Sequence, residues 1–140
     1  MTQEFSYPIR VYIEDTDAGG IVYYANYLKY FERGRTEFLR SLGFGKPALS
    51  NGGRMFIVSH LAMNYRRPAR LDDSLHVTVL VQKVGGATID FIQSVRKERE
   101  ILVDGTVKIA CLDQLNRRPV RLESSLREKL VLEQSLETRK

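Results

Sequence analysis

The chain has 140 residues, of which 43% are hydrophobic, 28% charged and 9% aromatic, and its formal net charge is +5. This length suits one domain spanning residues 1–140, and the composition excludes a disordered chain. The single cysteine, Cys111, excludes an internal disulfide framework, and no apolar run approaches the roughly 18 residues that cross a bilayer. We therefore expect a cytoplasmic protein with an anionic partner, whose nature charge alone does not identify.

The N-terminal third predicts a strand, a loop and a long helix. Alternating apolar residues predict a strand over Tyr7–Glu14 with one buried face. Asp15–Gly20 reads DTDAGG, a run of turn-forming residues that predicts a loop. Apolar residues at spacings near four and seven predict a helix from about Tyr23 to Leu42, stopped by Gly43. Because this apolar stripe exceeds half the circumference, we expect the helix to be largely buried against a sheet.

A two-residue period takes over after a linking loop at Phe44–Arg54 and predicts four further strands. These strands are expected at Ile57–Tyr65, Leu75–Val81, Ala87–Val95 and Ile101–Leu112. Gly85–Gly86, whose residues tolerate positive φ, predicts a tight hairpin between the second and third of them. Lys97–Glu100 predicts the next turn, and Asp104–Gly105 predicts a bulge within the last strand.

A short amphipathic C-terminal helix is predicted after Pro119 from the spacing of Leu126, Leu130 and Leu136. The element order predicts the α+β fold class, with an antiparallel β-sheet of about five strands wrapped around a long central α-helix. Such a sheet has open edges, and one protomer buries only part of the available apolar surface. We therefore expect a homodimer or homotetramer.

The segment DTDAGGIVYYANY places carboxylates and glycines directly before the long helix. The first amides of a helix lack acceptors and lie at the positive end of its dipole, so the backbone amides of Tyr23 and Tyr24 can receive a developing oxyanion. Gly19 and Gly20 would let a carbonyl group approach the backbone closely. Asp17 can serve either as a general base on water or as a nucleophile. A thioester suits this site because its thiolate, with a pKa of about 8.5, leaves without a strong general acid.

Structural roles are also open to the same residues. Aspartates before helices often cap them or form turns, and Asp15 fits such a role better than Asp17. Asn26 is either a helix-surface amide without a role or a group that orients Asp17 or a bound water. Glu32 is expected to form an ion pair with nearby arginines.

Three segments carry a resemblance to a known family. The segment Asp15–Leu39, DTDAGGIVYYANYLKYFERGRTEFL, closely resembles the signature of the 4-hydroxybenzoyl-CoA thioesterase-like hot-dog family, especially its Tol-Pal-associated acyl-CoA thioesterase branch. NYRRPARLDDSLHV and NRRPVRL resemble further segments of the same branch, so the likeness covers nearly the whole chain. The resemblance implies a hot-dog fold with a curved sheet, and hydrolysis of an acyl-CoA thioester to free acid and coenzyme A. No cofactor is implied, since coenzyme A is part of the substrate.

The resemblance also assigns roles to residues. It implies that Asp17 is the catalytic carboxylate and that the backbone amide of Tyr24 is the oxyanion donor. Gly19, Gly20, Tyr23 and Asn26 would then surround the substrate. Many members of the Tol-Pal-associated branch have a histidine where this chain has Tyr24, which brings this position closer to the 4-hydroxybenzoyl-CoA enzymes.

Basic residues and histidines add two further expectations. Two arginine clusters are either solvated loop charge or groups that meet the phosphates of coenzyme A. They are Arg66, Arg67 and Arg70, and then Arg117, Arg118 and Arg121. His60 and His76 lie opposite their apolar neighbours on predicted strands, which favours surface or interface positions. Neither has an acidic cluster or cysteine nearby, so no metal site is predicted.

Three other functions are compatible with parts of the sequence. A noncatalytic acyl-CoA-binding protein or envelope-complex scaffold is the alternative that the sequence leaves open. A hot-dog dehydratase generally uses a histidine with a carboxylate, and this loop and helix contain no histidine. A nucleic-acid-binding module would interleave basic residues with exposed aromatics, whereas the aromatics here have core-like spacings. No nucleic-acid partner is therefore expected.

Overall fold

The computed structural model describes residues 4–44 and 53–138, and its strands form one five-stranded sheet. The strands are β1 (Phe5–Arg10), β2 (Arg54–Tyr65), β3 (Ser74–Val84), β4 (Thr88–Lys97) and β5 (Glu100–Asp113). The helices are the 3-10 turn η1 (Ile13–Asp15), α1 (Asn26–Ser41) and α2 (Ser124–Thr138). Neighbouring strands are antiparallel in the order β1-β3-β4-β5-β2, so β1 and β2 form the two edges.

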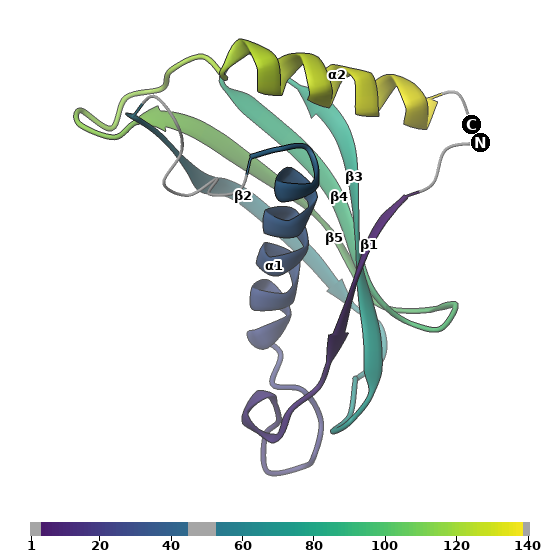
Figure 1. Ribbon diagram of the computed structural model, residues 1–140. Coiled ribbons are helices and arrows are strands. Elements are labelled where there is room, and N and C mark those ends of the chain that lie inside the picture. Colours follow the sequence, from purple (N-terminus) through teal and green to yellow (C-terminus); the bar gives the residue numbers. More distant parts are fainter. Residues whose placement is uncertain (1–3, 45–52, 139–140) are drawn as a thin grey trace.

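The sheet curves around α1, and α2 crosses one end of it (Figure 1). α1 packs against β1, β3 and β4, and α2 packs against β3. The concave face presents alternate residues of the central strands, among them Val77, Phe91 and Val103, which have no solvent exposure and belong to the same core cluster as Phe31 of α1. The expected α+β arrangement, with a long helix inside an antiparallel sheet and a short C-terminal helix, is confirmed. Among the described residues no helix combines the length and apolar character needed to cross a membrane.

α1 ends where the sequence predicts. Gly43 has a φ of +98°, its amide donates to the carbonyl of Arg40 at 2.9 Å, and the amide of Phe44 donates to the carbonyl of Leu39 at 3.0 Å. This pair of bonds is the Schellman motif, which satisfies the last carbonyls of a helix. Glycine suits this position because a side chain is strained at this φ.

The start of α1 differs from the prediction. α1 begins at Asn26, because the amide of Tyr23 donates to the carbonyl of Asp15 at 2.9 Å and holds residues 23–25 in a turn before the helix. Tyr24 and Leu28, which broaden the apolar stripe in the sequence, are 61% and 41% exposed, so this part of the stripe is not covered by the sheet. α1 buries one face, and the side toward β2 is open.

The first strand is shorter than predicted. Asp15 turns the chain, because its carboxylate accepts the amide of Tyr12 at 2.9 Å and its own amide donates to the carbonyl of Tyr12 at 2.9 Å. Val11 is fully buried, but Ile13 is 75% exposed in η1. The prediction that Ile13 lies on the buried face of a strand is therefore wrong.

Two glycine predictions have different outcomes. β3 and β4 form the expected hairpin, but neither Gly85 nor Gly86 adopts a positive φ. A Cβ at Gly85 would lie 2.6 Å from Oγ1 of Thr88, so the threonine side chain would have to move to admit it. The bulge predicted at Asp104–Gly105 is wrong, since the pairing of β5 with β2 and β4 is unbroken there.

Some predictions concern residues outside the described ranges. The linking loop predicted at Phe44–Arg54 falls mostly on residues 45–52, and β2 begins at Arg54. Leu126 and Leu130 of α2 are buried as expected, whereas the side chain of Leu136 is not among those described.

Candidate active site

Asp17 lies in a tight loop between η1 and α1. Its Oδ1 accepts the amide of Gly19 at 2.8 Å, and its carbonyl accepts the amide of Gly20 at 3.0 Å. Gly20 has a φ of +80°, a conformation that glycine adopts without strain. Oδ1 of Asp17 therefore holds the turn, whereas Oδ2 has no hydrogen-bond partner in the described part of the chain.

The carbonyl of Asp15 ties this loop to the start of α1. It accepts the amide of Tyr23 at 2.9 Å and Nδ2 of Asn26 at 2.8 Å, while the buried carboxylate accepts the amide of Tyr12. Asn26 therefore has a role that the sequence did not indicate, since in this structure it contacts Asp15 rather than Asp17. The sequence could not predict the hydrogen bond from Asn26 to Asp15, because its acceptor is a backbone carbonyl, which every residue carries.

The amides just before α1 are only partly available. The amide of Tyr23 is engaged by Asp15, so the expectation that it can receive an oxyanion is corrected. The amides of Tyr24 and Ala25 have no acceptor among the described residues. Unpaired amides at this end of a helix present a positive potential. The unpaired amides are therefore those of Tyr24 and Ala25, one residue further along the chain than expected.

Four tyrosine rings contact one another near the start of α1. Tyr24 lies edge-on to Tyr65 of β2 with ring centroids 6.1 Å apart, and the hydroxyl of Tyr65 donates to the carbonyl of Tyr24 at 3.4 Å. The ring centroids of Tyr23 and Tyr24 are 4.9 Å apart, and those of Tyr27 and Tyr65 are 5.7 Å apart. Burial raises the pKa of Tyr65, so its hydroxyl stays a neutral donor at physiological pH. Tyr65 was not predicted as part of the site, because only the fold brings β2 beside the start of α1.

The residues of the loop are open to solvent in one protomer. The side chains of Asp17, Tyr23 and Tyr24 are exposed, as are Gly19 and Gly20. No wall from the same chain covers them in the described structure. The site is therefore a shallow surface around a carboxylate and two amides.

Two cavities lie between α1 and β2. The larger, about 270 Å³, is bounded by Leu28 and Phe31 of α1, Val58 and Leu61 of β2, and Val107 of β5. The smaller, about 160 Å³, continues toward Leu39 and Phe56. Glu32 and Arg35 line both cavities. We call this hollow the α1–β2 groove.

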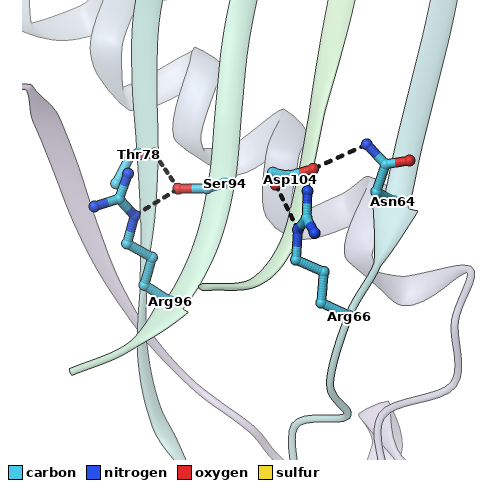
Figure 2. Close-up of polar contacts among 6 residues, drawn as sticks. All are labelled: Asn64, Arg66, Thr78, Ser94, Arg96 and Asp104. Atoms are coloured by element: carbon cyan, nitrogen blue, oxygen red, sulfur yellow. Dashed lines mark hydrogen bonds and ion pairs between the residues drawn. The ribbon is translucent and has the colours of Figure 1, made fainter. Parts of the chain in front are cut away.

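The two arginine clusters differ in their partners. Figure 2 shows Arg66 beside Asp104, where its Nε lies 2.7 Å from Oδ2, and the bond from Arg66 lowers the pKa of that carboxyl. Arg67 pairs with Glu100 at 2.6 Å. The second cluster, Arg117, Arg118 and Arg121, is exposed and forms no ion pair with the residues that the structure describes. The second cluster is therefore the freer one for binding anions.

The opposite face of the sheet carries hydrogen bonds of Ser94 with Thr78 and Arg96, which Figure 2 also shows. His60 is exposed and His76 is partly buried. Within residues 4–44 and 53–138, no three histidine, cysteine or acidic residues gather in a group that could hold a metal ion.

Comparisons with known proteins match most of the chain. Residues 11–130 match the model of the thioesterase-like superfamily. The chain is 49% identical over 117 residues to the acyl-CoA thioesterase YbgC of Haemophilus influenzae, an alignment covering 83% of this chain and 86% of that protein. It is 40% identical over 126 residues to the acyl-CoA thioester hydrolase YbgC of Escherichia coli O6:H1, covering 89% and 94% of the two chains.

Solved structures confirm the architecture. A probable thioesterase from Bartonella henselae superposes with a TM-score of 0.77 at 36% identity, covering 87% of this chain and all of that one. The DHNA-CoA thioesterase of Staphylococcus aureus superposes with a TM-score of 0.90 at 21% identity, covering 97% and 94% of the two chains, a likeness of fold alone. The class defined by this fold is the hot-dog thioesterase. The chain belongs to the thioesterase-like superfamily and is a thioester hydrolase.

Proposed function

We propose that this protein is an acyl-CoA thioesterase that hydrolyses an acyl-CoA thioester to a free acid and coenzyme A, with Asp17 as the reacting carboxylate. The observation that carries the proposal is the free Oδ2 of Asp17 in a loop tied to unpaired amides at the start of α1. The names of the YbgC relatives support the substrate class. The Tol-Pal-associated branch and a cytoplasmic location are parts of the same proposal.

The chemistry needs two functions from the chain. In the proposal, the thioester carbonyl oxygen lies against the amides of Tyr24 and Ala25, which stabilise the negative charge that develops on it. Along one route, Asp17 takes a proton from water as the water oxygen bonds to the carbonyl carbon. The tetrahedral intermediate then collapses, and the C–S bond breaks to release coenzyme A thiolate, which takes up the proton.

Along the other route, Asp17 attacks the carbonyl carbon itself. The thiolate leaves, a mixed anhydride forms, and water then hydrolyses the anhydride to free acid and the original carboxylate. The exposed position of Asp17 allows water to reach either intermediate. Single-turnover hydrolysis in ¹⁸O water tests the covalent route, since label enters Asp17 only when water opens the anhydride at the Asp17 carboxyl carbon.

Substrate binding draws on the surroundings of the loop. Gly19 and Gly20 have no side chains to hinder the thioester, and the exposed ring of Tyr23 offers an apolar contact. Asn26 acts in the proposal by holding the loop through Asp15 rather than by contacting substrate. The unpaired second cluster, Arg117, Arg118 and Arg121, is the proposed contact for the coenzyme A phosphates.

A second copy of the chain is part of the proposal. β2 is a sheet edge, and its residues Ile57, Val58 and Leu61 are 39%, 48% and 38% exposed. Exposed apolar residues on an unpaired edge favour pairing with another strand. We propose a homodimer, or a homotetramer built from dimers, in which the second protomer covers the open side of the reaction surface.

Thiol release from acyl-CoAs tests the proposed function. Purified protein is mixed with short aliphatic, long aliphatic and aromatic acyl-CoAs, and free thiol is followed over time. We expect at least one class to be hydrolysed with saturation kinetics, with the acid and coenzyme A formed in equal amounts. Tight binding without thiol release from any class would favour the noncatalytic acyl-CoA-binding alternative.

Asn26→Ala tests the anchor at Asp15. Loss of the Nδ2 bond frees the loop, so we expect kcat to fall about tenfold with little change in KM, because the misplacement affects the reaction more than binding. The matched control is Asn64→Ala, which removes a similar 3.0 Å bond to Asp104 on the other face of the sheet. Each variant should lose about 1 kcal/mol of unfolding free energy. Equal kcat values for the two variants would contradict a positioning role for Asn26.

A further inference from the structure

Residues 69–73, which we call the strap, lie between β2 and β3 and pair with the loop before α1. The amide of Val22 donates to the carbonyl of Ala69 at 2.9 Å, and the amide of Leu71 donates to the carbonyl of Gly20 at 3.3 Å. The residues between these two bonds form an antiparallel bridge. The strap is therefore a backbone support for this loop, although about 50 residues separate the two segments in the sequence.

Asp17 belongs to the same set of backbone bonds. Its amide donates to the carbonyl of Ile21 at 2.9 Å, and the preceding residue, Thr16, forms an isolated bridge with Val22. Val22 is thus bonded to the strap on one side and paired beside Asp17 on the other. A displacement of the strap is therefore passed to Asp17 through backbone contacts, without any movement of α1.

Asp73 holds the strap with both oxygens of its carboxylate. Oδ2 accepts the amide of Arg70 at 2.8 Å, and Oδ1 lies 3.0 Å from Nζ of Lys97 in β4. The amide of Asp73 also donates to the carbonyl of Arg70 at 3.1 Å, which closes a turn in which Asp72 has a φ of +70°. Few residues other than glycine adopt this φ readily, so the turn needs such outside support.

One peptide group connects Asp73 to the loop. The carbonyl of Ala69 and the amide of Arg70 belong to the same planar unit, so they cannot turn independently. The amide end is bonded to Asp73, and the carbonyl end accepts the amide of Val22. Loss of the Asp73 bond frees this peptide group to rotate, and Val22 then loses its acceptor.

The charge of Asp73 suits this role. Partial burial raises the pKa of its carboxyl, but the hydrogen bonds from Arg70 and Lys97 outweigh burial and hold the pKa below its ordinary value. The group is therefore a carboxylate at neutral pH. Because both of its oxygens are engaged, neither is left to contact substrate.

We propose that Asp73 is a positioning residue for thioester hydrolysis, because its carboxylate fixes, through the amide of Arg70, the strap that holds the loop carrying Asp17. The effect on the reaction rests on the function proposed above for Asp17. The effect on the order of the loop does not, since it follows from the hydrogen bonds alone.

Asp73→Ala tests the effect on the reaction. We expect kcat for acyl-CoA hydrolysis to fall about tenfold while KM stays within about twofold, because the displaced loop affects the reaction more than binding. Asp73→Asn keeps an oxygen for the amide of Arg70 and loses only the exposed ion pair with Lys97. Its kcat should therefore stay within about threefold of wild type.

Hydrogen exchange followed by NMR tests the order of the loop without substrate. In Asp73→Ala the amides of Val22 and Leu71, which join the loop to the strap, should exchange at least about tenfold faster than in wild type. Asp73→Asn should keep most of their protection. If Asp73→Ala does not fold, as judged by circular dichroism, Asp73→Glu replaces it, since its longer side chain displaces the oxygen from the Arg70 amide.

Asp104→Ala is the matched control. Asp104 is also a partly buried carboxylate with two partners, Nδ2 of Asn64 at 3.0 Å and Nε of Arg66 at 2.7 Å. Its removal should leave kcat within about twofold of wild type and exchange at Val22 unchanged.

Three results would overturn the proposal: wild-type kcat or wild-type exchange at Val22 in Asp73→Ala, an asparagine variant as impaired as the alanine variant, or equal effects in Asp104→Ala. If the wild type hydrolyses no acyl-CoA, the function proposed for Asp17 fails. The exchange rates at Val22 and Leu71 then decide the role of Asp73 by themselves.

Discussion

Asp17→Asn is expected to lower kcat/KM for acyl-CoA hydrolysis by at least about a hundredfold while leaving the fold intact. Asparagine keeps an Oδ1 that can accept the amide of Gly19, so the loop keeps its shape. The substitution removes the negative charge and the basic or nucleophilic oxygen that both routes need. Thiol release measures the rate, and thermal unfolding followed by circular dichroism measures stability.

The control for this experiment is Asp90→Asn, which makes the same chemical change on the opposite face of the sheet, where the side chain lies 3.9 Å from Lys108. We expect its hydrolysis rate to stay within about twofold of wild type, since surface changes away from the site have small effects. If Asp17→Asn also kept the wild-type rate, catalysis would have to reside elsewhere in the chain. Acyl-CoA hydrolysis by the wild type would still stand in that case.

Gly105→Ala is expected to be the most damaging single-methyl addition to the sheet. Gly105 pairs with Met63 across β5 and β2, and a Cβ at Gly105 would overlap the backbone carbonyl of Ala62. Because backbone atoms of a paired strand cannot rotate away, β2 must shift. We expect a loss of about 3 kcal/mol in the free energy of unfolding, the upper end for overpacking. Urea unfolding at a fixed protein concentration measures it.

Gly86→Ala is the matched comparison. Gly86 has no positive φ, and a Cβ there would meet no atom within 4 Å. An alanine at such a position restricts the unfolded chain, so the free energy of unfolding should be unchanged or raised by about 0.5 kcal/mol. Similar losses of unfolding free energy in both variants would contradict this prediction. They would mean that the spacing of β5 and β2 leaves room for an alanine side chain.

The sequence predicted the elements well where a periodic pattern meets a strong stop signal. Gly43 ended the long helix as expected because the Schellman motif is a local structure that few residues define. The extension of the first strand to Glu14 failed because alternation cannot show that the carboxylate of Asp15 captures the amide of Tyr12 and turns the chain. The sequence predicted a bulge at Gly105, but the glycine allows a close approach of β5 and β2, which the sequence does not display.

The sequence likewise predicted some features of the candidate site and missed others. The loop with Asp17 and two glycines before a helix was recognisable from residue types, and the structure finds that loop tied to the helix start. The sequence did not reveal three contacts of this site. They are the hydrogen bond of Asn26 to Asp15, the bonded amide of Tyr23 and the position of Tyr65 beside Tyr24. These depend on backbone acceptors and on residues distant in the chain.

By itself the sequence determined the secondary structure, the α+β class and the acidic loop before the helix, because periodicity and turn chemistry act between near neighbours. The tertiary structure alone decided which side of α1 faces the sheet and which side stays open toward β2. It also left Arg35 buried without an ion-paired anion among the described residues, with Glu32 exposed beside it. Burial and charge pairing depend on chain segments meeting in space, so no local pattern specifies them.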